Sequence, residues 1–305
     1  MKILSLLPSA TEVVYALGLG DDLVGVTEEC DFPPDAVTKP VVSRSALAHR
    51  PLSAREIDEA VRERMGEQQP LYILDTEAIR REQPDVILTQ DLCRVCAVPS
   101  GQVQRALDDL GASDAKVLSL DPQSLDDVIA QIEIVGKLLG RAAEAASVAG
   151  LLRARVARTR EIGSRTPTVR ILALEWSDPP FVGGHWIPEM VEVVGGSNLL
   201  NGKGERSKQI SWHDVADASP EVIVFMPCGY YLDEAVDEAS GLWDMAPFAD
   251  TPAARTGNVF AVDATSFFSR PGPRLVDGLE ILAWAVHPDA YPPPPVGTIA
   301  KIEPP

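Results

Sequence analysis

The chain alternates short apolar runs with stretches in which apolar residues recur every three or four positions. The runs predict buried β-strands, and the periodic stretches predict amphipathic helices. Because strands and helices alternate, we expect parallel sheets with helices on both faces, in an α/β protein with two doubly wound lobes. The strands are predicted at residues 2–7, 23–27, 41–43, 85–89, 116–120, 169–174, 221–226 and 259–262.

Between the two lobes the sequence predicts one long helix, from Ser124 to Gly163. Apolar residues repeat every three or four positions throughout this stretch, and a glycine is typical of a helix end. At 1.5 Å per residue such a helix would be roughly 55–60 Å long. Glycines inside it allow a bend, so one bent helix or two collinear helices both fit. We expect it to be a rigid connection between the lobes.

These elements predict a division of the chain into four parts. At the start of the first part, Ser9 and Glu12 have the spacing of a capping box, which predicts Ser9 as the residue that caps a helix. The last part is rich in proline and is expected to be extended, without a core of its own. The parts are an N-terminal lobe (1–121), a connecting helix (122–165), a C-terminal lobe (166–287) and a tail (288–305).

Composition limits the function classes. A net charge of −18 argues against binding to nucleic acid or to anionic membrane surfaces, which requires basic patches. No apolar run approaches eighteen residues, so no transmembrane helix is predicted. The apolar start is too short for an export signal, which predicts a cytoplasmic protein, or a periplasmic or cell-surface one if an export segment had been removed. Four cysteines in such a chain indicate thiols, ligands or redox groups.

Unusual side chains follow the predicted strands. In open α/β sheets, ligands bind beyond the carboxyl ends of the strands. All four cysteines fall on such loops, and if the two lobes face each other these residues line one cleft. The residues predicted to bind ligand are Ser9, Cys30, Arg44, Cys93, Arg94, Cys96, Trp176, His185, Trp186, Cys228, Tyr230, Phe267, Phe268 and Arg270.

The cysteine pair in Cys93-Arg94-Val95-Cys96 has several readings. The spacing allows a redox pair or disulfide, a metal site formed with Cys30, or thiols that pack a loop in contact with ligand. The loop reading is favoured, because the next predicted helix starts several residues later. For His185, an ordinary loop histidine is favoured over a metal ligand. Loop aromatics such as Trp176 and Trp186 suit a large planar ligand.

No sequence motif indicates catalysis. The chain has no phosphate-binding loop, no GxSxG nucleophile elbow and no HExxH zinc motif. We therefore expect a non-enzymatic protein with no catalytic cofactor. A thiol- or metal-dependent enzyme built on the same fold is the alternative.

Several short motifs occur in the order and spacing of a known family. Up to about His287 the chain resembles the helical-backbone (class III) substrate-binding proteins of ABC importers, and within them the vitamin B12-binding branch. The motifs are Leu6-Leu7-Pro8-Ser9-Ala10-Thr11-Glu12, Cys30-Asp31-Phe32-Pro33, Gln83-Pro84-Asp85-Val86-Ile87, Pro179-Pro180-Phe181, Gly195-Gly196-Ser197-Asn198 and Pro273-Arg274.

The resemblance implies two Rossmann-like lobes joined by a long rigid helix. It also implies a cobalamin or related corrinoid held between them for import or intracellular handling. Heme, siderophore or metal-ion binding are the alternatives. Family members dock on an ABC permease through one acidic residue per lobe; Glu77 stands at the first position, and His213 beside Asp214 at the second. The vitamin-binding relatives place cleft tryptophans where this chain has Ser45 and Ser207.

Overall fold

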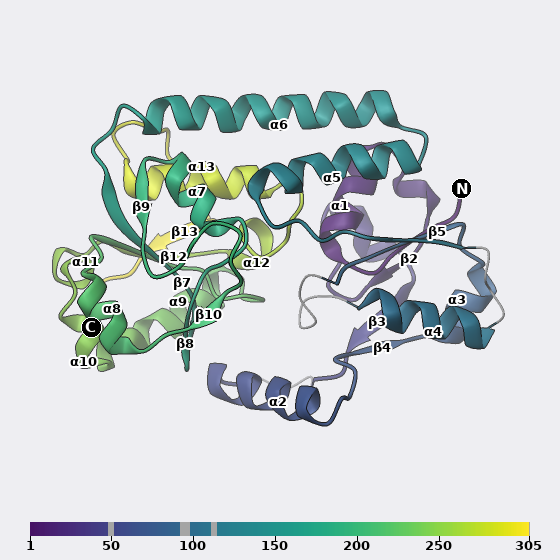
Figure 1. Ribbon diagram of the computed structural model, residues 1–305, viewed down its shortest axis with the longest axis horizontal. Coiled ribbons are helices and arrows are strands. Elements are labelled where there is room, and N and C mark those ends of the chain that lie inside the picture. The colour runs from purple at the N-terminus through teal and green to yellow at the C-terminus, as the bar shows by residue number, and fades with distance from the viewer. Residues whose placement is uncertain (48–51, 92–97, 111–114, 305) are drawn as a thin grey trace. The chain divides into compact units, whose positions relative to one another are not determined.

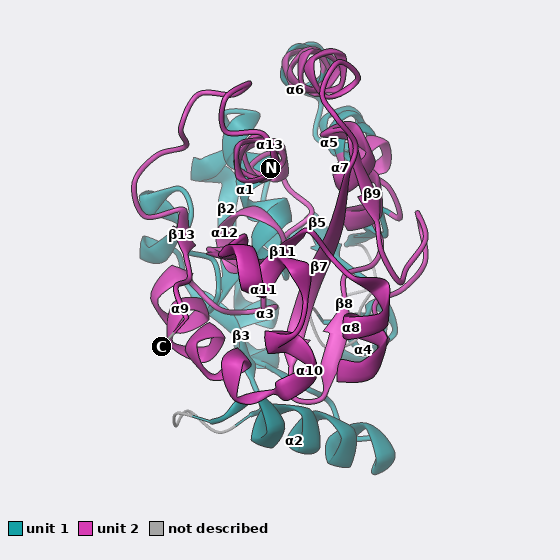
Figure 2. Ribbon diagram, turned by 90° about the vertical axis from the view of Figure 1, so that its left-hand side faces the viewer, with its two compact units in different colours: residues 1–122, 129–149 teal, residues 123–128, 150–305 magenta. Residues whose placement is uncertain are grey.

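The computed structural model describes residues 1–47, 52–91, 98–110 and 115–304. Its residues form two compact units, each built around one sheet (Figure 2). Unit 1 comprises residues 1–122 and 129–149, and unit 2 comprises residues 123–128 and 150–305. None of the helices in the described ranges has the length and apolar character needed to cross a membrane.

The sheet of unit 1 has the strand order β4-β3-β2-β1-β5-β6 (Figure 1). Neighbours pair in parallel except β4, which runs antiparallel to β3 at the edge. The strands are β1 (Ile3–Ser5), β2 (Leu23–Thr27), β3 (Val41–Ser45), β4 (Tyr72–Leu74), β5 (Val86–Thr89) and β6 (Lys116–Ser119). The parallel core confirms the predicted strand pattern, and β4 is an addition that the sequence did not indicate.

Four helices accompany this sheet: α1 (Pro8–Ala16), α2 (Ala54–Gly66), α3 (Thr76–Glu82) and α4 (Ser100–Leu110). Helix α1 begins two residues earlier than a cap at Ser9 predicts, because Pro8 occupies its first turn and Leu7 takes the N-cap position without a side-chain bond. The predicted capping box of Ser9 and Glu12 is therefore wrong. Both residues instead lie within the helix, and their side chains are buried.

The sheet of unit 2 has the order β10-β8-β7-β11-β12-β13, and β9 also pairs with β7. Its centre, β7, β11 and β12, is parallel, whereas β8, β10 and β13 run antiparallel to their neighbours. The strands are β7 (Val169–Ser177), β8 (Pro180–Val182), β9 (Gly196–Asn198), β10 (Lys208–Gln209), β11 (Val222–Phe225), β12 (Val259–Val262) and β13 (Ile299–Lys301).

The helices of unit 2 pack against this sheet around a core that includes Leu172, Ile223 and Phe225, each fully buried. Arg155 on helix α6 (Ala142–Gly163) forms ion pairs with Asp277 and Glu280 on helix α13 (Leu275–Val286), at 2.5 and 2.7 Å. The helices are α7 (Ile187–Val193), α8 (Trp212–Ala218), α9 (Leu232–Ser240), α10 (Ala246–Ala249), α11 (Pro252–Thr256), α12 (Ala264–Phe267) and α13 (Leu275–Val286).

The stretch predicted as one helix from Ser124 to Gly163 contains two, α5 (Leu125–Leu138) and α6 (Ala142–Gly163). They run antiparallel: Gly136 lies against Ala145 in unit 1, and Asp126 pairs with Arg153 at 3.8 Å in unit 2. Collinear helices are therefore excluded. The turn is at Gly140, whose φ of +72° suits glycine, and Arg141 N–H donates to the Gly136 carbonyl at 2.7 Å.

Both helices belong partly to each unit, and the longer of the two is α6 (Figure 2). Its residues up to Ala149 are part of unit 1, and those from Gly150 onward are part of unit 2. With 22 residues it is about 33 Å long, shorter than the roughly 55–60 Å expected for a single straight helix.

Two further expectations need correction in unit 2. Strand β7 continues through Glu175 and Trp176, which were expected on a loop, because β8 folds back as its antiparallel partner. The proline-rich segment 288–305 does not stay apart from the core: β13 pairs with β12, Ile302 is buried in the unit 2 core, and the Tyr291 hydroxyl donates to the Thr159 carbonyl at 2.8 Å.

The close packing of α5 on α6 gives a stability prediction. A Cβ at position 136 would lie 2.2 Å from the Ala145 Cβ and 2.9 Å from the Arg141 carbonyl oxygen. We expect Gly136→Ala to push the two helices apart and lower the free energy of unfolding by about 1–3 kcal/mol. Urea unfolding followed by circular dichroism measures the change.

The matched control is Gly150→Ala on α6, where an added Cβ meets no atom within 4 Å. Alanine has the higher helix propensity, so this variant should gain about 0.5–1 kcal/mol. A change of the same sign and size in both variants would contradict the packing described for Gly136.

Candidate functional site

In unit 1, buried hydroxyl and thiol groups gather at the carboxyl ends of β1 and β2. The Thr11 hydroxyl of α1 donates to the Ser5 hydroxyl at 2.9 Å and lies 3.1 Å from the Cys30 sulfur. The Thr27 hydroxyl lies 3.9 Å from the same sulfur. All four side chains are at most 3% exposed, so Cys30 is a packed thiol within a hydrogen-bonding network. Ser9, in the same first turn of α1 as Thr11, is also buried.

One charged candidate also belongs to unit 1. Arg44, on β3, is exposed and pairs with Glu28 at 3.4 Å. The other Glu28 carboxylate oxygen accepts the backbone N–H of Ser45. Cys93, Arg94 and Cys96 lie outside the described residues, so the metal site predicted for Cys30, Cys93 and Cys96 stays a prediction.

In unit 2, Trp176 and Tyr230 form an aromatic pair at the carboxyl ends of β7 and β11. Their ring centroids are 5.4 Å apart and their planes are inclined by 69°, an edge-to-face contact. Burial, together with Glu238 and Glu234, raises the pKa of the Tyr230 phenol to about 12, so the phenol stays protonated at neutral pH. Cys228 lies on the loop after β11, where its N–H donates to the Glu175 carbonyl at 3.3 Å.

The carboxyl group of Glu175 is buried next to this pair. It accepts hydrogen bonds from the Ser207 hydroxyl and the Gly184 N–H, whereas its Oε2 atom is buried without a partner among the described residues. Burial raises the pKa of this carboxyl above its ordinary value, because the charged form is poorly solvated. Glu175 therefore ties two loops, at 184 and 207, to the end of β7.

His185 lies between these two loops in a strained conformation. Its φ of +55° is unusual for a residue with a side chain. Its N–H donates to the Glu205 carbonyl at 2.6 Å, and its own carbonyl accepts the Gly204 N–H at 3.1 Å. The ring's Nδ1 is buried without a partner in the described structure. Burial, and the nearby Arg206 charge, lower the pKa of His185, which favours the neutral imidazole.

Three of the predicted aromatic residues pack into unit 2 near the end of β12. Trp186 is only 5% exposed, and its indole N–H donates to the Phe268 carbonyl at 2.9 Å. Phe268 is also buried, so Trp186 and Phe268 contribute to the core. Phe267 is partly exposed, and the Arg274 guanidinium lies 5.7 Å from its ring centroid. Arg270 follows on the same loop and is partly exposed.

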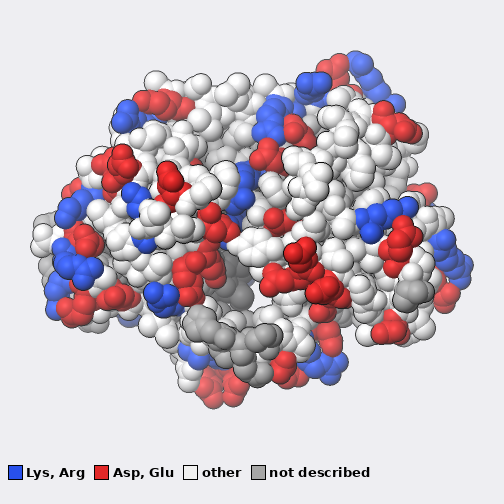
Figure 3. Space-filling model, turned by 180° about the vertical axis from the view of Figure 1, so that it is seen from behind, with Lys and Arg blue, Asp and Glu red and all other residues white. Residues whose placement is uncertain are grey.

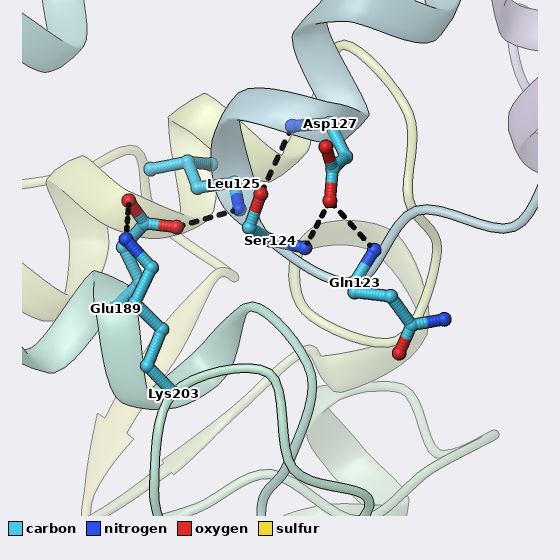
Figure 4. Close-up of polar contacts among 6 residues, drawn as sticks. All are labelled: Gln123, Ser124, Leu125, Asp127, Glu189 and Lys203. Atoms are coloured by element: carbon cyan, nitrogen blue, oxygen red, sulfur yellow. Dashed lines mark hydrogen bonds and ion pairs between the residues drawn. The ribbon is translucent and has the colours of Figure 1, made fainter.

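A second buried carboxylate, that of Glu189, holds the other end of the loop formed by residues 203–207 (Figure 4). Glu189, on α7, accepts the Leu125 N–H at 2.9 Å, where α5 begins, and the Lys203 ammonium at 2.8 Å. The start of α5 is completed by a capping box: the Ser124 hydroxyl accepts the Asp127 N–H, and the Asp127 carboxylate accepts the Ser124 N–H. Glu189 and Glu175 thus hold residues 203–207 from both ends.

The residues predicted for permease docking lie on separate units. Glu77 is in the first turn of α3, with 75% of its side chain exposed and an ion pair to Arg80 at 3.0 Å. Asp214 is in the first turn of α8, exposed, and its carboxylate accepts from the Ser211 N–H and hydroxyl, both at 2.7 Å. These bonds lower the pKa of Asp214.

Several residues of this site were not predicted. Glu189, Lys203 and Thr11 act through partners far away in the sequence or on another element, and no local pattern marks them. Ser207 had a signal, because the resemblance placed a tryptophan at its position. Among the described residues no group of three or more His, Cys, Asp or Glu side chains is arranged to hold a metal ion.

The buried Glu175 carboxyl predicts a specific pH dependence. Because its folded-state pKa is raised, its contribution to stability is greatest below about pH 4.5 and is lost as the pH rises through the folded-state value. Glu175→Gln stays uncharged and keeps an acceptor for Ser207. We expect its free energy of unfolding, relative to wild type, to rise between pH 4.5 and 7.5, measured by thermal unfolding at a series of pH values.

The control is Glu221→Gln, which changes an exposed carboxylate at the amino end of β11, the opposite end of the strand. Its effect on stability should be smaller than that of Glu175→Gln, because the Glu221 carboxylate is exposed. A pH-independent difference for Glu175→Gln would contradict a buried carboxyl with a raised pKa.

Comparison with known proteins places this fold. Residues 3–265 match the family described as "Periplasmic binding protein". The chain is 27% identical, over 92% of its length and 86% of the relative, to a vitamin B12-binding protein of Vibrio cholerae. It is 25% identical, over 95% of its length and 81% of the relative, to an uncharacterized ABC transporter substrate-binding lipoprotein of Bacillus subtilis.

A solved structure agrees with these relatives. The periplasmic heme-binding protein of Roseiflexus sp. RS-1, in its apo form, superposes with a TM-score of 0.69 at 25% identity. The match covers 95% of this chain and 98% of that one. The two-lobe α/β fold and the matched family model together identify the chain as a member of the periplasmic binding protein family.

Proposed function

We propose that this chain is a non-enzymatic binding protein whose ligand is a corrinoid of the cobalamin type. The observation that carries the proposal is the similarity to a vitamin B12-binding protein along 92% of the chain. The site in unit 2 supports it, since the aromatic pair of Trp176 and Tyr230 stands at the strand ends where α/β proteins bind ligands. Edge and face contacts of this kind suit a large, mostly apolar macrocycle.

Heme is the second candidate. A heme-binding protein of the same fold is 25% identical to this chain, and a flat porphyrin would use the same aromatic contacts. His185 is relevant to either chelate, because its ring atom Nδ1 has no hydrogen-bonding partner among the described residues. A neutral imidazole in this state is able to coordinate a chelated metal.

The aromatic pair gives a direct test of the proposal. Purified protein should bind cyanocobalamin at micromolar or lower concentration in an equilibrium titration, with hemin as the competing candidate. Trp176→Leu removes the ring that contacts Tyr230, and we expect it to weaken ligand binding by about tenfold or more.

The matched control is Trp212→Leu, in which the same substitution is made on α8 of the same unit, where Trp212 packs against Phe248 with centroids 5.9 Å apart. This variant should keep the wild-type affinity. Tight binding of hemin with no binding of cyanocobalamin would favour the second candidate, and no binding of either chelate would overturn the proposal.

We also propose that the protein delivers its ligand to an ABC permease. The support is the family and the relative named as an ABC transporter substrate-binding lipoprotein. Glu77 is the clearer docking candidate, because its carboxylate projects into solvent, whereas that of Asp214 also caps α8.

Reversing the charge at Glu77 tests this role. With the permease of the same organism reconstituted in liposomes, we expect Glu77→Lys to reduce ligand-stimulated ATP hydrolysis at least fivefold without changing ligand affinity. Glu63→Lys, at an exposed glutamate on α2 of the same unit, serves as the control and should have little effect. Unchanged stimulation by Glu77→Lys would exclude Glu77 as a docking residue.

A further inference from the structure

One corner of unit 2 combines the aromatic pair with carboxylates. Tyr230 ends the loop after β11, and α9 starts two residues later. The Glu234 carboxylate turns back to accept the Tyr231 N–H at 2.9 Å, and the Glu238 carboxylate accepts the Ser177 hydroxyl at the end of β7. These bonds hold both carboxylates close to the Trp176–Tyr230 pair. We call this set of Trp176, Tyr230, Glu234 and Glu238 the aromatic–acid corner.

The charged residues at the aromatic–acid corner are all acidic. Helix α9 carries four acidic residues and neither lysine nor arginine. Figure 3 shows acidic side chains gathered to the right of centre, on the part of the molecule that unit 2 forms. Both glutamates act electrostatically on the Tyr230 phenol and raise its pKa, which shows that their negative field reaches the aromatic pair. A group that contacts these rings therefore lies in a negative potential.

The buried residue Thr265, whose backbone contacts Tyr230, carries a hydroxyl without a partner among the described residues. The Thr265 N–H donates to the Tyr230 carbonyl at 3.0 Å, which fixes this residue against the loop. Its side chain is 6% exposed, and the hydroxyl oxygen makes no hydrogen bond within the described structure. A buried hydroxyl without a partner is costly, so such groups usually have a partner in the functional state. This observation is independent of the acidic residues and also indicates an absent polar partner.

We infer that the aromatic–acid corner determines ligand specificity by accepting an amide-bearing or cationic edge of the chelate and rejecting an edge that carries carboxylates. The inference rests on the proposed function, since it concerns the ligand bound at the same strand ends. Peripheral amides can donate N–H groups to Glu234 and Glu238, and the apolar parts of the macrocycle can contact Trp176 and Tyr230.

This assignment separates the two candidate ligands chemically. Corrinoids of the cobalamin type carry amides around the ring, whereas heme carries two propionate carboxylates. A ligand carboxylate near Glu234 or Glu238 would meet like charge and would also lose its solvation. At separations of several ångströms in a partly solvated site, the two protein carboxylates together should weaken the binding of an anionic edge by about fivefold.

The experiment uses a matched pair of ligands and a matched pair of variants. Titrations at low ionic strength would compare cyanocobalamin with its monocarboxylic derivatives, in each of which one propionamide has been hydrolysed. Glu234→Gln and Glu238→Gln, singly and combined, remove charge but keep a side-chain oxygen to accept the Tyr231 N–H and the Ser177 hydroxyl. Glu221→Gln, at the opposite end of β11, is the control for the change in net charge. Thermal unfolding would confirm that each variant is folded.

We expect the wild type to prefer cyanocobalamin over at least one monocarboxylic isomer by about tenfold or more. The double variant should reduce that preference to about twofold, and Glu221→Gln should keep it. An undiminished preference in the folded double variant would overturn the inference and leave the proposed function intact. Tighter binding of hemin than of cyanocobalamin by the wild type would also overturn it. Failure of the wild type to bind any of these chelates would overturn the proposed function itself, and this inference with it.

Discussion

The geometry of unit 2 depends on two buried acidic side chains and on the hydrogen bonds that they accept. Removing a carboxylate from water costs several kcal/mol unless hydrogen bonds or an opposite charge compensate. Glu189 meets this demand with the first amide of α5 and with Lys203. Glu175 meets it only in part, with Ser207 and Gly184, and burial raises its pKa. The loop between Lys203 and Ser207 is thereby fixed, together with the strained His185 that lies against it.

This arrangement explains how a short, irregular loop can belong to a binding surface. Loops that lack regular hydrogen bonding need other restraints to keep one conformation. Here the loop is held from a strand, through Glu175, and from a helix, through Glu189. The aromatic side chains nearby differ in position. Trp186 and Phe268 are buried in the core, whereas Trp176 and Tyr230 lie at the strand ends. Unit 1 contributes a different chemistry at its strand ends, a compact set of hydroxyls around Cys30.

The sequence predicted the elements that a local run of apolar residues defines. It missed the elements that depend on contacts with another segment of the chain. Strands such as β5 and β11 are continuous buried runs, and they were located to within one or two residues. The turn at Gly140 was missed because α5 and α6 both bury apolar residues every three or four positions, so the periodicity continues across the turn. The short strand β8 is defined by its pairing with β7, which no local pattern shows.

The same contrast between local patterns and contacts with distant segments applies to the candidate site. The principle that ligands bind at strand ends located Trp176, Tyr230 and Cys228 correctly relative to the sheet. The burial of Trp186 was not foreseen, because its neighbouring glycines indicated a surface loop, whereas its indole bonds to a carbonyl 82 residues away. Glu189 and Leu125 are 64 residues apart, and their contact exists only once the fold is formed.

The antiparallel strand β13 has a consequence for how the protein behaves if that segment is lost. Strand β12 is buried along all four of its residues, and β13 supplies the hydrogen bonds on its outer side. Without residues 299–301, β12 would become a bare edge of unpaired amides and carbonyls flanked by valine and phenylalanine. An edge of this kind recruits strands from other molecules. Proteolytic trimming of the proline-rich end would thus convert a stable sheet into a template for self-association.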